Sequence, residues 1–172
     1  MADIATLLML EDTRDFDGDV LQMILRSPHP ELRRRAAMSI ARINDPRGRA
    51  MLRAAYPDAD TAVSASLIFG AGQMKDSAAA KWLDTLLKQP TTPVTVAFEA
   101  ARSLGKIRTP EAHSALATYL AGVKETRFTR SVIGEALLSI SRFSTRGDLG
   151  PIIRHTRSPD VEVRWRATAS SK

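Results

Sequence analysis

Histidines are the side chains in this sequence that are best suited to acid–base catalysis or to binding a transition metal. The chain has three of them, His29, His113 and His155. A metal site requires ligands that converge on one point, but these residues lie far apart, and none belongs to an HxxxH or HxH pair. We therefore expect ordinary surface or partly buried histidines, with His29 in a turn and His113 solvated in the first turn of a helix.

A glycine-containing stretch, GAGQMK, begins at Gly70 and resembles part of a dinucleotide-binding loop. That fingerprint needs a further glycine at the position of Lys75 and a strand before the first glycine. The sequence has lysine there, and no strand-like alternation precedes it. We interpret Gly72 instead as a small residue that lets two helices pack closely.

Four aspartates near the N-terminus have a spacing similar to that of a calcium-binding loop. In such a loop a glycine follows the first ligands at a fixed position, and a glutamate closes the twelve residues. Here Gly18 is misplaced and no glutamate closes the loop. We expect a solvated acidic turn that caps the next helix, formed by Asp12, Asp15, Asp17 and Asp19.

Other signs of catalysis are missing from the sequence. It has no cysteine, and therefore no thiolate and no disulfide, and it has neither a GxSxG motif nor a P-loop. The sequence therefore predicts a protein that is not an enzyme and that needs no cofactor or metal.

Composition and charge indicate one helical domain with a basic surface. The 172 residues, 44% of them apolar and 5% aromatic, suit a single domain with an aliphatic core. No apolar run approaches the ~20 residues of a membrane span. The net charge is +6, but residues 1–20 carry −5 and the remainder +11. A basic surface can attract nucleic acid or acidic proteins, although alanine- and arginine-rich chains are also common in GC-rich bacteria.

The strongest pattern is an internal repeat. The phrase SPHPELRRRAA at Ser27 returns, 131 residues later, as SPDVEVRWRAT at Ser158. Three weaker copies lie between them, at successive steps of 31, 33, 36 and 31 residues. A fixed pattern at this period is typical of stacked repeats. The recurring apolar slots are Leu32, Ala36, Ala37, Ile40, Ala41 and Ile43; Val63, Leu67, Ile68, Ala71, Gly72 and Met74; Val96, Ala100, Ala101, Leu104, Gly105 and Ile107; and Val132, Ala136, Leu137, Ile140, Ser141 and Phe143.

Each slot pattern predicts a helix, because spacings of four, four and three residues align its members in one stripe. A shorter amphipathic helix precedes each copy, and breakers such as SPHP, PDAD and QPTTP separate the two. Between repeats stand NDPRG, MKDS, IRTPE and STRGD. We predict about eleven helices, the first over residues 2–12 and then five antiparallel pairs, with no strands.

This pattern resembles the short bacterial form of the HEAT repeat, also called the PBS-lyase-like HEAT repeat. The similarity rests on the proline-flanked turn, the arginine after an aliphatic residue, the Ala36–Ala37 doublet and the closing INDPRG. It implies an all-α fold, an α-solenoid of about five helical hairpins. The resemblance also implies that Arg33 pairs with a loop aspartate, Asp45 or Asp76. Some HEAT-like folds are bilin lyases or DNA glycosylases, but no matching nucleophile or cofactor motif is present here.

The repeats set the expected domain layout. One HEAT-repeat domain spans residues 1–172, with an N-terminal cap or half repeat over 1–16. The repeats follow at about 17–46, 47–75, 76–108, 109–145 and 146–172. The last is expected to be truncated, because Ser171 falls on the slot of Ile40. We therefore expect the native protein to continue, and the resemblance suggests a neighbouring domain such as a prolyl isomerase.

A partner would bind where the second helices of the pairs present their outer stripe, because second helices line the concave face in HEAT-like stacks. Arginine, methionine and large aromatic residues are enriched at protein interfaces, although the phenylalanines could equally be core residues. Glu99 and Glu135 are expected on the same stripe. The candidate partner-binding residues are Arg34, Met38, Arg42, Phe69, Phe98, Arg102, Lys106, Leu138, Arg142, Trp165 and Arg166.

Three functions follow from this surface. The first is a non-catalytic scaffold that binds a partner protein. The second is a nucleic-acid binder that uses the arginine-rich face, which the two glutamates would interrupt. The third is a spacer that positions a neighbouring domain.

Overall fold

The computed structural model describes residues 2–143 and 149–171, and over these ranges it contains eleven α-helices, two short 3-10 segments and no strand. The prediction of an all-α fold built from helical pairs is confirmed. The chain forms two compact units, Met1–Asp76 and Ser77–Lys172. The expected break STRGD, residues 144–148, lies outside the described residues.

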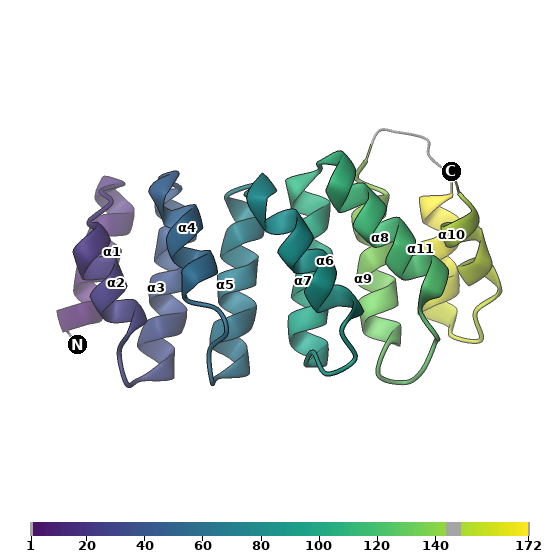
Figure 1. The fold of residues 1–172 in the computed structure, drawn as a ribbon, viewed down its shortest axis with the longest axis horizontal. Coiled ribbons are helices and arrows are strands. Elements are labelled where there is room, and N and C mark those ends of the chain that lie inside the picture. Colours follow the sequence, from purple (N-terminus) through teal and green to yellow (C-terminus); the bar gives the residue numbers. More distant parts are fainter. Residues whose placement is uncertain (1, 144–148, 172) are drawn as a thin grey trace. The chain divides into compact units, whose positions relative to one another are not determined.

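The first unit consists of five helices (Figure 1). Helix α3 packs against α1 on one side and α5 on the other, while α2 and α4 cover the row from a second layer. The core is aliphatic and includes the fully buried Leu21, Ile40, Leu52 and Leu67. The helices are α1 (Ala2–Thr13), α2 (Gly18–Leu25), α3 (Pro30–Ile43), α4 (Arg47–Ala54) and α5 (Thr61–Gln73).

Of the predicted acidic turn, Asp17 caps α2, whereas Asp12 lies within α1 and Asp19 within α2. The side chain of Asp17 accepts a hydrogen bond from the backbone N–H of Val20, at 3.0 Å. An N-cap carboxylate satisfies a helical N–H group that would otherwise lack a partner. Asp60 and Asp160 cap α5 and α11 in the same way, so the repeated aspartates have a structural role.

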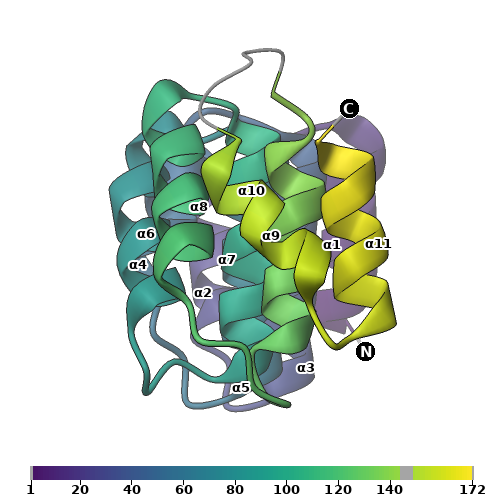
Figure 2. The same cartoon turned by 90° about the vertical axis from the view of Figure 1, so that its right-hand side faces the viewer.

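The second unit repeats this two-layer arrangement. Helix α9 packs between α7 and α11, and α8 packs between α6 and α10. Figure 2 shows α11 beside α9 and α10 beside α8. The elements are η1 (Ser77–Ala79), α6 (Ala80–Lys88), α7 (Val94–Ile107), α8 (Pro110–Gly122), α9 (Arg130–Ile140), α10 (Gly150–Ile153), η2 (Arg154–Arg157) and α11 (Val161–Ser170).

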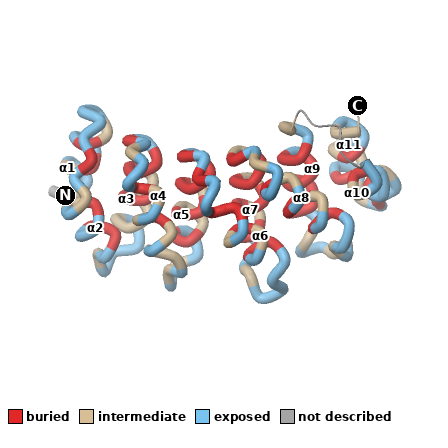
Figure 3. Tube along the Cα trace, turned by 45° about the horizontal axis from the view of Figure 1, so that its top comes forward, coloured by how far each residue is buried: buried red, intermediate tan, exposed pale blue. Residues whose placement is uncertain are grey.

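The repeated apolar slots form the core. Ala37, Ile68, Ala101 and Leu137 occupy one slot and are all fully buried, and Figure 3 shows buried segments recurring along the second helices. Three slots depart from the pattern: Leu32 and Phe143 are half-buried, and Ser141, which follows the end of α9, is exposed.

Small residues allow close helix packing at the slot that Gly105 occupies. A Cβ atom placed on Gly105 would lie only 2.5 Å from the Cβ of Ser139 on α9. Ordinary carbon–carbon separations between packed side chains are about 3.5–4.0 Å. Glycine is therefore required there, because α7 and α9 lie too close together for a side chain.

The predicted pairing of Arg33 with Asp45 or Asp76 is wrong. Its guanidinium makes two hydrogen bonds with Asp58, at 2.7 and 2.8 Å, in the turn before α5. Arg33 lies in the first turn of α3, whereas Asp45 follows the opposite end, about 18 Å along the helix axis. Asp45 pairs with Arg47, and Asp76 with Arg53.

Candidate functional site

The second-helix face of the second unit is defined here as the outer surface of α7, α9 and α11. Two glutamates expected to be exposed on this face are instead buried, Glu99 to 8% exposure and Glu135 to 3%. Glu135 of α9 is approached by arginines of both neighbouring second helices, Arg102 of α7 and Arg166 of α11, whereas Glu99 lies beside Arg102 of its own helix. The prediction that these carboxylates interrupt an exposed basic stripe is therefore wrong.

Arginines link these buried carboxylates from helix to helix. Arg102 approaches Glu99 at 3.2 Å within α7 and Glu135 of α9 at 3.4 Å. Arg166 of α11 lies 4.0 Å from the second carboxylate oxygen of Glu135 and 2.7 Å from Glu162. Much of the basic charge of this face is thus engaged in holding the helices together.

Burial shifts the protonation equilibria of this cluster. Removal from water raises the pKa of Glu99, an effect that the nearby Arg102 only partly offsets. Burial likewise lowers the pKa of Lys106, one helical turn after Arg102. Within the described residues, Oε1 of Glu99 has no hydrogen-bond partner. A buried carboxylate without full hydrogen bonding is costly, so this group is held in place by the surrounding packing.

Apolar side chains lie exposed on the same face. Leu138 on α9 is 41% exposed and Trp165 on α11 is 69% exposed. Phe98 on α7 is half-buried beneath the guanidinium of Arg102, which lies 4.8 Å from the ring centroid. Arg142, just after α9, is half-buried. Large apolar side chains flanked by arginine are typical of protein-binding surfaces.

The remaining candidates lie on the first unit, on the outer surface of α3 and α5. Arg42 pairs with Glu11 of α1 at 2.7 Å, and the Ser39 hydroxyl donates to the other oxygen of that carboxylate. Arg34 pairs with Glu31 on its own helix at 2.8 Å. Met38 and Phe69 are half-buried. The structure places these four candidates on the first unit and the other seven on the second.

The histidines do not converge. His29 is the exposed N-cap residue of α3. His155 is buried, and its Nε2 lies 3.0 Å from the carbonyl oxygen of Leu120. The prediction that His113 is solvated is wrong, because it is half-buried against Phe143, with ring centroids 5.1 Å apart. Among the described residues, no group of three or more His, Asp or Glu side chains could hold a metal ion.

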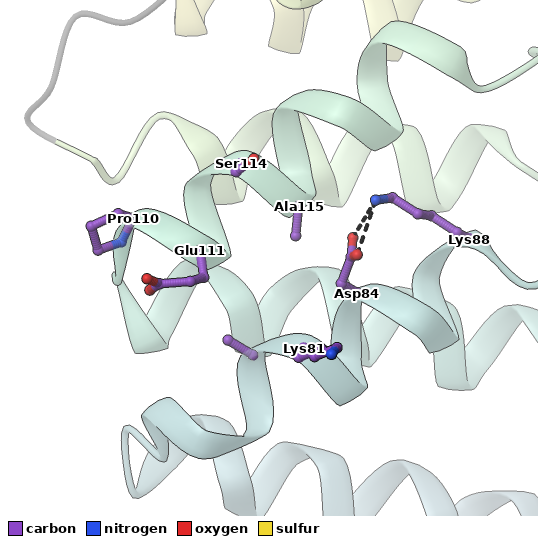
Figure 4. Close-up of a pocket in the computed structure, with 8 residues that line it drawn as sticks. Lys81, Asp84, Lys88, Pro110, Glu111, Ser114 and Ala115 are labelled. Atoms are coloured by element: carbon purple, nitrogen blue, oxygen red, sulfur yellow. Dashed lines mark hydrogen bonds and ion pairs between the residues drawn. The ribbon is translucent and has the colours of Figure 1, made fainter.

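Two pockets in the second unit contain none of the candidate residues. One, of about 470 Å³, lies between α6 and α8, where Asp84 and Lys88 pair at 2.7 Å (Figure 4). The other, of about 540 Å³, lies between the loops that follow α6 and α8. Its one sequence signal is Phe128, an aromatic residue in the otherwise polar loop KETRFTR.

Comparison with known proteins identifies the family. The model of HEAT repeats matches residues 19–97 and 51–138. The chain therefore belongs to the HEAT repeat family, whose members are generally non-enzymatic scaffolds for protein interactions. No curated protein matches the sequence. In the part of the chain that the structure describes, every helix is too short or too polar to cross a bilayer.

Proposed function

We propose that this HEAT repeat protein is a non-catalytic scaffold that binds a segment of a partner protein on the second-helix face of its second unit. The observation that carries the proposal is the exposure of Leu138 and Trp165 on adjacent helices. Large apolar groups exposed beside charged residues often mark an interaction site. The candidates on the first unit would supply a further contact surface.

The electrostatics of the face favour a protein segment over nucleic acid. Phosphate binding requires several free cations and gives a steep loss of affinity with salt. Arg102 and Arg166 already bind buried or neighbouring carboxylates. Binding through apolar contacts with Leu138 and Trp165, by contrast, has an affinity that depends on the buried apolar area and tolerates salt.

Arg102 is a poor choice for testing this face, because its replacement by glutamate would add a third acid to Glu99 and Glu135. Leu138→Ala and Trp165→Ala are better choices, since both residues are apolar and exposed and their replacement adds no charge. The matched control is Ile153→Ala, on a first helix and 53% exposed. We expect the two face variants, but not the control, to lose at least ten-fold in affinity for a partner identified by crosslinking, with unchanged melting temperatures.

Two results would contradict the proposal. If only nucleic acid is bound, and 200 mM salt releases it steeply, the arginine-rich face is a nucleic-acid site. If neither variant changes partner binding, the second-helix face is not the site, and the chain acts as a spacer or binds elsewhere.

A further inference from the structure

The pocket between the loops after α6 and α8 is a separate surface, and it shares no lining residue with the candidates of the second-helix face. Both loops lie at the lower edge of the second unit in Figure 1. The pocket has a volume of about 540 Å³, within the ~300–1,000 Å³ usual for a ligand site. Several of its lining residues, among them Val94, Lys124 and Phe128, are exposed, so the pocket opens to solvent.

Apolar groups form the floor and the rim. The buried side chains of Leu87, Tyr119 and Val132 line the interior. Val94 and Phe128 stand at the rim, 40% and 60% exposed. Exposure of these apolar groups to water is unfavourable, and an apolar ligand that covers them would gain the free energy of their burial.

The charge at this pocket has one sign. Lys88 and Lys124 are among its lining residues, and no carboxylate is. The nearby Glu125 is engaged elsewhere, because it accepts hydrogen bonds from Arg130 at 3.3 Å and from Ser158 at 3.0 Å.

Further cationic charge stands close by. The guanidinium of Arg127 lies over the ring of Phe128, 4.5 Å from its centroid. Lys88 pairs with Asp84 one turn earlier on α6, which leaves Lys124 and Arg127 as the main positive charges beside the rim. A ligand that enters the pocket is therefore favoured if it carries a carboxylate next to its apolar part.

Tyr119, one of the lining residues, carries a further hydrogen-bond donor. Burial raises the pKa of Tyr119 to about 12, so its phenol stays protonated at neutral pH. A buried phenol usually finds a hydrogen-bond partner, and an incoming peptide carbonyl or carboxylate oxygen can accept from it.

We propose that this pocket binds a partner-protein segment that inserts one large apolar side chain and places an aspartate or glutamate within two residues of it. A peptide fits better than a small ligand, because the exposed Val94 and Phe128 extend the apolar surface beyond the cavity to flanking residues. The surface is independent of the second-helix face, so either proposal can fail alone.

Gly122 is a position at which bulk can be added beside the pocket. It lines the cavity, and a Cβ atom placed on it meets no atom within 4 Å. Gly122→Trp therefore adds bulk at the pocket wall in open space. Lys124→Glu reverses the rim charge, and Lys81→Glu is its control, an exposed lysine outside this pocket.

The probe is a phage-displayed library of random dodecapeptides, selected on the full chain. We expect the recovered sequences to share a large apolar residue with an acid within two positions. In fluorescence-anisotropy titrations of a recovered synthetic peptide, Gly122→Trp should weaken binding at least ten-fold and Lys124→Glu at least three-fold. Lys81→Glu should leave binding unchanged, and replacing the peptide's acid by its amide should match the loss caused by Lys124→Glu.

Four outcomes would overturn the inference. Recovered peptides without an acid would remove the charge argument. Equal binding to the filled variant would place the site elsewhere. Self-association of the chain that Gly122→Trp abolishes would identify the occupant as a second copy. Peptides weakened by Trp165→Ala but not by Gly122→Trp would refute this pocket and leave the proposed function standing.

Discussion

Replacing Gly105 by alanine tests the closest helix packing in the second unit. Alanine is normally the better residue in a helix, by about 1 kcal/mol over glycine. At this position the added methyl group would lie 2.5 Å from the Cβ atom, 2.6 Å from the Oγ atom and 2.9 Å from the Cα atom of Ser139. The last of these atoms belongs to the backbone, so rotation of the serine side chain cannot relieve the overlap, and α7 and α9 must move apart.

The size of the effect follows from two opposing contributions. Overpacking a well-packed core costs about 1–3 kcal/mol, and the helix propensity of alanine offsets up to about 1 kcal/mol of that. Pushing α7 and α9 apart would also strain the ion pair of Arg102 with Glu135, which joins the same two helices. We expect a net loss of about 1–2 kcal/mol in the free energy of unfolding.

The assay is urea unfolding followed by circular dichroism at 222 nm, with Gly122→Ala as the matched control. A methyl group on Gly122 meets open space, so that variant should be as stable as the parent or slightly more stable. Ser139→Gly removes the two side-chain atoms that the new methyl group would overlap, and the Ser139 hydroxyl has no hydrogen-bond partner within the described residues. Combined with Gly105→Ala, it should therefore restore part of the loss. Two results would refute this account of the packing. One is that Gly105→Ala is as stable as Gly122→Ala, and the other is that adding Ser139→Gly restores none of the stability lost in Gly105→Ala.

Three further predictions use the same unfolding assay. Burial lowers the pKa of His155, so its contribution to stability is present above the unfolded value of about 6.5 and is lost as the pH falls through the folded value. Stability between pH 7.5 and 5.5 should therefore fall more steeply in the parent than in His155→Gln; parallel curves would contradict this. Glu135→Gln should cost about 2 kcal/mol because it weakens a buried ion-pair cluster, whereas Glu162→Gln, at an exposed pair, should cost well under 1 kcal/mol; equal losses would argue against a buried cluster. Arg33→Lys should cost about 1 kcal/mol through loss of the paired hydrogen bonds with Asp58, and in the Asp58→Asn background that cost should shrink; an unchanged cost would show that the pair contributes nothing.

The sequence determined the fold through features that are local or periodic. The slots of Ile40, Leu67, Leu104 and Ile140 follow the helical repeat, so their burial could be read from spacing alone. Caps such as Asp17 act within three residues of their own position, so they could also be predicted from the sequence. A pattern that recurs at a fixed step also predicts which helices become neighbours, since each repeat stacks on the next.

Tertiary structure decided which charged groups are buried or paired and where pockets form. Whether Glu99 faces water or a neighbouring helix depends on a rotation of a few tens of degrees about the helix axis, and a hydrophobic pattern that includes only apolar residues does not resolve that angle. Arg33 pairs with Asp58 rather than with Asp45 or Asp76, because pairing follows distance in space and the two predicted aspartates lie in other turns. The pocket beside Phe128 likewise depends on how two loops, more than thirty residues apart in the sequence, come together. Helix periodicity is set by local backbone geometry, whereas ion pairs and pockets are set by distances between segments, which only the packed chain defines.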